Sequence, residues 1–381
     1  MPVDRELPSS EAVALLELTR DLVAREVLPV ASDMEAKAEF PRELFRTLGK
    51  AGLLGLAYPE ELGGGGQPYE VYLQVLEELA AGWVGLAVGV SVHTLSCFPV
   101  AQWGSPEMKE RFLPDMLGGD LLGAYCLSES HSGSDAAALS TKAVLAGDDY
   151  VVNGTKAWVT HGGHADFYNL MVRTSGDGPS GISCLLAASD TPGLVAQPPE
   201  KKMGMRSAHT ASIVLDGAKV PADRLVGQEG QGFPIAMSAL DGGRLGIAAC
   251  AVGLAQSALD LGVAYAKERK QFGKAIAEFQ GVSFLLADLA TQVEAARALY
   301  LSAARRRDRG QPYGPQAAMS KLFATDTAMR VTTDVIQVLG GAGYVEDHPA
   351  ERYFREAKVM QIFEGTNQVQ RIVIGRSLTR P

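Results

Sequence analysis

The chain has 381 residues, of which 46% are hydrophobic and 21% charged, and its formal net charge at pH 7 is −9. This length predicts two or three domains, and the composition excludes general disorder, which requires low hydrophobicity and a high net charge. The acidic balance argues against a nucleic-acid binder. The one dense basic run, at residues 305–309, has no interleaved aromatic side chains for base stacking and is interpreted as a solvated helix end.

No segment directs the chain to a membrane or out of the cell. The N-terminal residues lack the basic and then apolar pattern of a signal peptide, and the most apolar stretch, residues 80–92, is shorter than the ~20 residues that a span needs. The four cysteines form no CxxC pair, and His161 and His164 have no nearby thiol or carboxylate. We therefore expect a cytoplasmic protein with no membrane span, no disulfide framework and no metal site.

Residues 1–121 have a helical pattern. Ser9 precedes an apolar run with helical spacing, which predicts the start of a helix. Pro41 is suited to the first turn of a second helix. A glycine-rich loop follows over residues 58–66, and a further helix is predicted over residues 71–80. These elements define an N-terminal α-helical domain.

The sequence pattern of residues 122–230 predicts several short strands. β-rich runs at residues 150–160, 167–172, 182–187 and 212–215 are separated by Gly, Pro, Ser and Asp. The dipeptide Asn153-Gly154 inside the first run predicts a hairpin turn there, which is also how we interpret the formal glycosylation sequon at this point. The pattern predicts a central antiparallel β-barrel or sandwich domain.

Residues 231–381 return to helix. No proline lies between Pro234 and Pro312, and Ala, Leu, Gln, Glu and Arg dominate this interval. The segment 269–273, which ends at Gly273, is predicted to interrupt the helix. Two or more long antiparallel helices, as in a four-helix bundle, are expected. The fold class is therefore α+β and multi-domain, with predicted domains at residues 1–121, 122–230 and 231–381.

Three polar or glycine-rich clusters are candidate ligand sites, although each alone also fits an ordinary loop, cap or surface. Residues 126–135 hold four serines that could cradle a phosphate or a heterocycle. Residues 337–344 contain three glycines, which would let a ligand approach the backbone. Residues 362–367 place one carboxylate, Glu364, between apolar residues and a glycine. No Rossmann fingerprint, P-loop, HExxH or GxSxG motif accompanies them.

Together, the motifs of this chain resemble those of the acyl-CoA dehydrogenase family over nearly the whole length. In chain order they are PEELGG (59–64), CLSESHSGSD (126–135), AWVTHG (157–162), KKMGMRSAHTASIVLDGAKVP (201–221), GQEGQGF (227–233), LDGGRLGIAACAVGLAQSALD (240–260), ERKQFG (268–273), QVLGGAGY (337–344) and IFEGTNQVQR (362–371). The resemblance implies FAD as cofactor and oxidation of an acyl-CoA thioester to trans-2-enoyl-CoA. It further implies electron transfer to electron-transferring flavoprotein and a homotetramer built as a dimer of dimers.

The resemblance also assigns roles to individual residues. Glu364 is the implied base that removes the α-proton. Some relatives carry this base directly before the arginine that matches Arg244, but Gly243 stands there in this chain. The implied FAD contacts are Tyr125, Cys126, Leu127, Ser128, Ser134, Trp158, Val159, Thr160, Arg269, Phe272, Gln280, Gln337, Val338, Leu339, Gly340, Gly341, Thr366 and Asn367, some of them across a subunit boundary. The implied substrate contacts are Ser134, Asp241, Arg244 and Gly365.

Alternatives remain open at this point. An oxygen-using acyl-CoA oxidase-like flavoenzyme shares the fold, although it is usually larger, and the acyl group could be bound to a carrier protein instead of CoA. A scaffold protein that retained only the fold would not bind flavin. The Gly-Gly-Arg segment at 242–244 resembles short-chain and short-branched-chain members, but the sequence does not reveal the length or branching of the acyl group.

Overall fold

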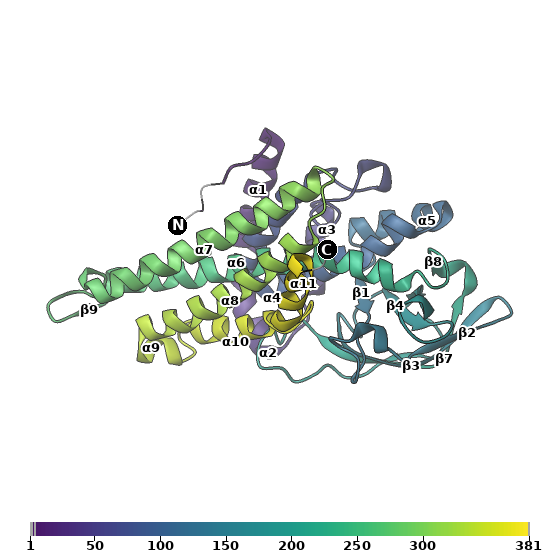
Figure 1. Cartoon of the computed structure of the whole chain (residues 1–381). Coiled ribbons are helices and arrows are strands. Elements are labelled where there is room, and N and C mark those ends of the chain that lie inside the picture. The colour runs from purple at the N-terminus through teal and green to yellow at the C-terminus, as the bar shows by residue number, and fades with distance from the viewer. Residues whose placement is uncertain (1–2, 4, 380–381) are drawn as a thin grey trace.

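The computed structural model describes residue 3 and residues 5–379. Helices from both ends of the chain form one side of the molecule, and a β-sheet built from the middle of the chain forms the other (Figure 1). This arrangement confirms the expected order of helical, β and helical regions. The outermost residues of the two predicted end domains, 1–2, 4 and 380–381, lie outside the described residues.

The N-terminal helices begin close to where the sequence predicts them. The side chain of Ser9 accepts a hydrogen bond from the backbone N–H of Ala12 at 3.1 Å and so caps α1. Pro41 precedes α3 at the cap position and therefore does not lie in its first turn. The helical elements of this region are α1 (Ser10–Leu22), a π-helical segment (Val23–Val27), α2 (Leu28–Lys37), α3 (Arg42–Lys50), α4 (Tyr69–Trp103) and α5 (Pro106–Gly118).

Helix α4 is much longer than the predicted segment 71–80. It runs to Trp103 across a break at Trp83, whose φ of −160° and ψ of 104° are not helical. By length and composition, α4 and the later helix α6 (Gly232–Glu268) are each apolar enough to cross a membrane, but 94% and 67% of their apolar windows are buried inside the protein. Their apolar character is therefore accounted for by packing in the helical core.

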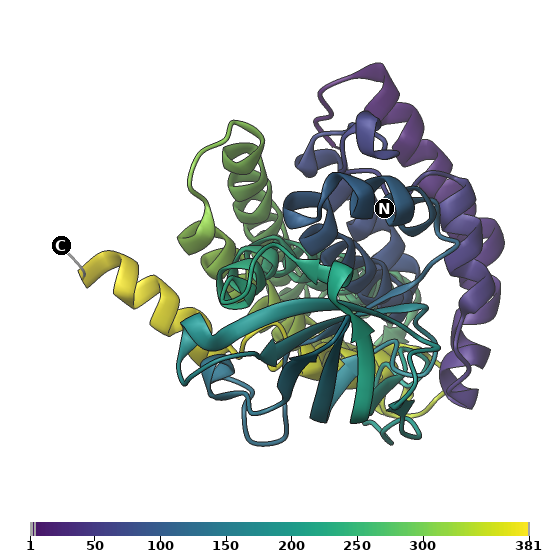
Figure 2. The same cartoon turned by 90° about the vertical axis from the view of Figure 1, so that its right-hand side faces the viewer.

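The central region forms one eight-stranded sheet, which curves beside the helices (Figure 2). Most neighbours are antiparallel, but β1 pairs with β4 in parallel and β2 also meets β4 in parallel, so the sheet is mixed. The strands are β1 (Gly123–Cys126), β2 (Lys142–Ala146), β3 (Asp149–Thr160), β4 (Phe167–Arg173), β5 (Ile182–Ala188), β6 (Leu194–Ala196), β7 (Thr210–Pro221) and β8 (Leu225–Val226), with the main order β6-β7-β3-β2-β4-β5-β8.

The predicted hairpin at Asn153-Gly154 is wrong. Strand β3 continues through this dipeptide, and its pairing with β7 shifts register there. Gly154 has a φ of +150°, and a Cβ at this position would lie 2.5 Å from Oγ1 of Thr141, while Asn153 Oδ1 accepts a hydrogen bond from the N–H of Gly217 at 2.8 Å. The same residue types that favour a tight turn therefore form a β-bulge. The hairpin turn lies earlier, at residues 147–148 between β2 and β3.

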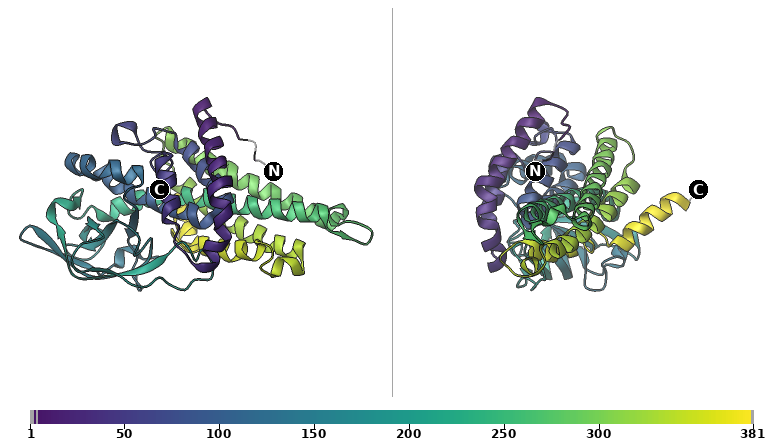
Figure 3. Two further views of the ribbon diagram at one scale, coloured as in Figure 1. Left: turned by 180° about the vertical axis from the view of Figure 1, so that it is seen from behind. Right: turned by 90° about the vertical axis from the view of Figure 1, so that its left-hand side faces the viewer.

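The C-terminal region is a bundle of long helices, as predicted. Helix α6 packs against α4 so closely that a Cβ on Gly253 would lie 2.3 Å from the carbonyl oxygen of Glu77. After α6 the chain forms a small hairpin, β9 (Lys270–Gln271) and β10 (Lys274–Ala275), at the end of the bundle far from the sheet, and returns along α7 (Figure 1, Figure 3). The remaining helices are α7 (Gln280–Asp308), α8 (Gly314–Leu339), α9 (Gly341–Tyr344), α10 (Ala350–Met360) and α11 (Asn367–Thr379).

Candidate active site

The carboxylate of Glu364 lies in the loop between α10 and α11, at the centre of the molecule. Its backbone has a φ of +52°, in the left-handed region that a non-glycine residue rarely adopts. The Oε2 atom is buried and has no hydrogen-bond partner. Burial raises the pKa of Glu364 to about 7, although the positive charges of Arg244 and Lys321 oppose this change. A strained, desolvated carboxylate without a partner is typical of a functional group.

Helix α6 faces this carboxylate with a glycine. A Cβ on Gly243 would lie 3.0 Å from Oε2 of Glu364 and 3.3 Å from Cδ1 of Leu95, so a larger residue would compete with the carboxylate for space. One residue further on, Arg244 forms an ion pair with Asp241, and its Nε atom is buried without a partner. Burial raises the pKa of Asp241 despite the Arg244 charge. Of the two predicted substrate contacts on α6, Arg244 therefore acts directly on Glu364, and Asp241 is joined to Arg244 by the ion pair.

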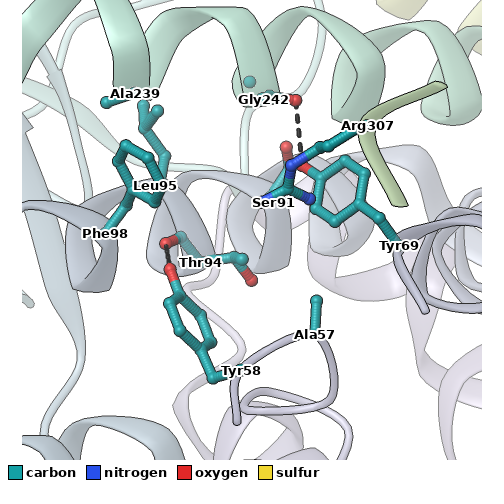
Figure 4. A pocket seen from close by; sticks show the side chains of 11 residues that line it. Ala57, Tyr58, Tyr69, Ser91, Thr94, Leu95, Phe98, Ala239, Gly242 and Arg307 are labelled. Carbon is teal, nitrogen blue, oxygen red and sulfur yellow. Dashed lines mark hydrogen bonds between the residues drawn. The ribbon is translucent and has the colours of Figure 1, made fainter. Parts of the chain in front are cut away.

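A narrow cavity opens between α4 and α6 beside Gly243 and Leu95 (Figure 4). The hydroxyl of Tyr69 donates to the carbonyl oxygen of Gly242 at 3.0 Å, and the guanidinium of Arg307 lies 3.4 Å from the centre of the Tyr69 ring. The cavity volume is ≈ 20 Å³. Its lining comprises Ala57, Tyr58, Tyr69, Ser91, Thr94, Leu95, Phe98, Ala239, Gly242, Gly243 and Arg307.

A larger cavity of ≈ 270 Å³ lies between the sheet and the helix that leads to Glu364. Thr160 lines it from the end of β3, and Ile362 and Phe363 line it from the residues directly before Glu364. Further lining residues are Val88, Lys202, Met203, Gly204, Met205, Ala208, Thr210, Arg355, Lys358 and Val359. A mostly apolar cavity with a few polar groups suits a flat ring system with polar edges.

The predicted flavin contacts of the β-region differ in whether their side chains or only their backbone atoms can reach a ligand. The Trp158 side chain is 56% exposed, on a backbone with a φ of +56°, and the Tyr125 hydroxyl is buried without a hydrogen-bond partner. Ser134 is exposed and Ser128 is half-buried. By contrast, the side chains of Cys126, Leu127 and Val159 are buried in hydrophobic clusters, so only the backbone of these residues is available to a ligand.

The predicted FAD contacts at the β9–β10 hairpin, on α7 and at the end of α8 lie far from Glu364 within one chain. Arg269 and Phe272 are at the β9–β10 hairpin, at the end of the helical bundle away from the sheet (Figure 1, Figure 3). Phe272 is 93% exposed and has a φ of +53°. Gln280 at the start of α7 and residues 337–341 at the end of α8 are also mostly exposed, except that Leu339 is buried. A single chain therefore does not unite the two groups of predicted cofactor residues.

The loop residues after Glu364 are held mainly by contacts within the chain. The Asn367 side chain is buried and donates through Nδ2 to Thr325 at 3.0 Å and to Asp326 at 2.7 Å. Its Oδ1 accepts from Lys321 at 2.8 Å, and Thr366 Oγ1 accepts from the N–H of Val369 at 3.2 Å. No sequence signal marks Lys321, because a lysine inside a regular helix belongs to no motif.

These features fit a flavin and an acyl thioester. The larger cavity can take a ring system. Near Glu364, the buried polar atoms Tyr125 Oη, Arg244 Nε and Glu364 Oε2 have no hydrogen-bond partner. In the part of the chain that the structure describes, no group of three or more His, Cys, Asp or Glu side chains could hold a metal ion.

Comparison with known families gives the same class of protein. The N-terminal domain of acyl-CoA dehydrogenases matches residues 9–120, the middle domain matches residues 124–218 and the C-terminal domain matches residues 230–379. The chain belongs to the acyl-CoA dehydrogenase family, whose members are flavoprotein oxidoreductases.

Individual relatives extend over almost the entire chain. An acyl-CoA dehydrogenase of Bacillus subtilis (strain 168) is 43% identical over 372 residues, which cover 97% of this chain and 98% of that protein. The structure of butyryl-CoA dehydrogenase from Megasphaera elsdenii is 39% identical, with a TM-score of 0.96 over 99% of this chain and 100% of that one. A chain from a structural study of the electron transferring flavoprotein of Acidaminococcus fermentans and flavin-based electron bifurcation is 40% identical, with a TM-score of 0.97 and complete coverage of both chains.

Proposed function

We propose that the protein catalyses the FAD-dependent α,β-dehydrogenation of a short acyl-CoA to the trans-2-enoyl-CoA, with Glu364 as the base. The observation that carries this proposal is the buried Oε2 atom of Glu364, which has no hydrogen-bond partner and faces Gly243 in the lining of the narrow cavity. The residue directly before it, Phe363, lines the larger cavity. When bound, FAD supplies the acceptor for the hydride that leaves the β-carbon.

Glu364 is suited to removing a proton from carbon. A carboxylate in water is far too weak a base for the α-proton of a thioester, and burial raises its basicity to a pKa of about 7. Because Oε2 accepts no hydrogen bond in the structure, its lone pairs are free for the α-proton. Arg244 and Lys321 oppose the rise in pKa, which keeps a substantial fraction of the carboxylate ionised near neutral pH. We further propose that the Glu364 backbone N–H helps to hold the thioester carbonyl, since placed donors stabilise a developing enolate.

The narrow cavity is the proposed site of the acyl tail. It begins at Gly243 and Leu95, which lie next to the Glu364 carboxylate, and the side chains of Tyr58, Tyr69 and Phe98 restrict it further on. A short chain is proposed because these side chains restrict the cavity and because a butyryl-CoA dehydrogenase is among the similar structures. Asp241, Arg244, Ser134 and Gly365 remain the proposed contacts with the rest of the acyl-CoA.

A second copy of the chain is needed to complete the proposed FAD site. The contacts at Arg269, Phe272, Gln280 and residues 337–341 lie at the far end of the bundle, so they would serve the flavin of a neighbouring subunit (Figure 1). Helix α11 projects from the body of the chain and exposes Ile372 and Leu378 (Figure 2). We propose a homotetramer, built as a dimer of dimers, that is cytoplasmic and passes electrons to an electron-transferring flavoprotein.

The decisive experiment replaces Glu364 with Gln, which keeps the shape and removes the base. The purified variant should retain the flavin absorbance bands but lose roughly 10²–10⁴-fold in dye-coupled oxidation of butyryl-CoA. Near-normal turnover would refute the role of Glu364. A colourless wild-type protein that cannot take up added FAD would favour a scaffold instead.

Two further measurements separate the remaining enzymatic alternatives. Rapid reoxidation of the reduced enzyme by air in a stopped-flow experiment, with formation of peroxide, would identify an oxidase. Turnover of a carrier-protein thioester in preference to the matched CoA thioester would identify a carrier-dependent dehydrogenase. A panel of straight, branched and aromatic acyl-CoAs then defines the acyl specificity.

A further inference from the structure

The loop that carries Glu364 adopts an unfavourable backbone conformation. Glu364 has a φ of +52° and Gly365 a φ of +82°, so two successive residues are left-handed. A residue with a side chain rarely adopts this conformation, because its Cβ approaches the backbone too closely. It persists only where surrounding contacts hold it. The contacts that hold this loop therefore determine where the Glu364 carboxylate lies.

One of these contacts is made by a buried lysine, Lys321, on the neighbouring helix α8. Lys321 Nζ donates to the carbonyl oxygen of Gly365 at 2.9 Å and to Oδ1 of Asn367 at 2.8 Å. The same Gly365 carbonyl accepts a second hydrogen bond from Nε2 of Gln370 at 2.9 Å, and Gln370 Nε2 also approaches the Glu364 carbonyl at 3.1 Å. Lys321 thus bonds to Gly365, the second residue of the left-handed pair, and to Asn367, two residues further on.

The lysine is also an unusual residue to find in this place. Its side chain is fully buried, and within the described residues no carboxylate oxygen lies within 4.0 Å of its ammonium group. A buried ammonium destabilises a protein unless other groups compensate for its lost hydration. A neutral hydrogen-bond donor would have satisfied the Gly365 carbonyl at a smaller cost. The positive charge itself therefore requires an explanation.

The charged groups around Lys321 supply that explanation. Glu364 and Asp326 are the acidic groups that act on it, and Arg244 is the other cation nearby. Burial lowers the pKa of Lys321 to about 7 against the effect of the two acids, while Lys321 and Arg244 lower the pKa of Glu364. Each of these two charges therefore favours the other: the ionised carboxylate stabilises the ammonium, and the ammonium stabilises the ionised carboxylate.

We propose that Lys321 is a positioning residue for the proton transfer: it fixes the strained loop through the Gly365 carbonyl and stabilises the ionised form of Glu364. It acts through Glu364 and does not itself touch the reacting atoms. This inference rests on the function proposed above, with Glu364 as the base. It adds a second requirement for catalysis, carried by a position on α8 that lies outside all of the motifs.

The test compares Lys321→Met, Lys321→Gln and Lys321→Arg with wild-type holoenzyme. The Met variant removes both the donor and the charge, Gln keeps a donor without the charge, and Arg keeps the charge. Lys50→Met, at an exposed position on α3, is the control for loss of a lysine. Two quantities are measured for each: the pH dependence of kcat with butyryl-CoA, and hydrogen–deuterium exchange of the peptide that spans residues 361–370.

For Lys321→Met we expect kcat at pH 7 to fall at least 10-fold, KM to change less than 3-fold, and the rising limb of the kcat profile to move up by roughly one pH unit. The loop peptide should exchange faster, while peptides from the sheet stay unchanged. Lys321→Gln should move the limb with a smaller effect on exchange, and Lys321→Arg should leave the limb in place. If Lys321→Met fails to fold, the comparison of Lys321→Gln with Lys321→Arg tests the proposal, because only the Gln variant should move the limb.

The proposal is overturned if the limb does not move in Lys321→Met and Lys321→Gln, or if loop exchange in the Met variant equals that of the wild type. Failure of the proposed function gives a different result. In that case Glu364→Gln keeps its turnover and no Lys321 variant moves the limb, although the loop exchange still rises.

Discussion

The raised pKa of Glu364 predicts that this carboxylate destabilises the folded protein at neutral and higher pH. Burial takes the pKa from 4.5 to about 7 in the folded state. The folded state therefore holds a proton that the unfolded chain releases, and stability falls as the pH rises between these two values. The loss is absent below about pH 4.5 and complete above about pH 7. At about 1.36 kcal/mol for each pH unit, it amounts to roughly 3 kcal/mol.

Glu364→Gln removes this penalty while keeping the shape of the side chain. Because a multidomain chain need not unfold in two states, the quantity to measure is the difference in Tm between variant and wild-type holoenzyme at each pH from 5 to 8.5. We expect the variant to gain stability over the wild type as the pH rises, with most of the gain between pH 5 and 7. Glu110→Gln, at an exposed position on α5, is the control for removal of a carboxylate. A Tm difference that stays flat over this range would refute the argument that Glu364 is desolvated.

Three other substitutions test separate parts of the structure. Gly243→Ala should lower kcat at least 10-fold with flavin still bound, because its Cβ would lie 3.0 Å from Oε2 of Glu364; turnover and the flavin spectrum measure this. Gly154→Ala should destabilise the protein by about 1–3 kcal/mol at the β-bulge, seen as a lower Tm, and an unchanged Tm would contradict the strain at φ +150°. Lys156→Met should cost about 3–5 kcal/mol, because it leaves Glu129 buried without its 2.8 Å ion-pair partner. Because Glu129 belongs to the serine-rich segment 126–135, a predicted FAD contact, the variant should also lose FAD. An unchanged Tm together with retained FAD would contradict this role of the Lys156–Glu129 ion pair.

Much of the architecture followed from local chemistry in the sequence. Apolar spacing, the Ser9 cap and the long proline-free interval predicted the helices, because helix formation depends on neighbours three and four residues apart. The extent of α4 could not be predicted in this way, since its apolar run continues through the non-helical Trp83 and is defined by burial against α6. The hairpin predicted at Asn153-Gly154 was wrong for a related reason, because pairing with β7 determined whether the dipeptide became a turn or a bulge.

For the candidate site too, some features could be predicted from the sequence and others depend on tertiary contacts. The sequence by itself determined the candidate residues: a single carboxylate before a glycine, a glycine before Arg244, and serine and glycine clusters of the acyl-CoA dehydrogenase pattern. Only the tertiary structure decided that Oε2 of Glu364 is buried without a partner opposite Gly243, and that Lys321 on α8 donates to the loop at Gly365. The physical reason is that basicity and strain depend on desolvation and on charges brought close by distant segments, and no local pattern in the chain records these.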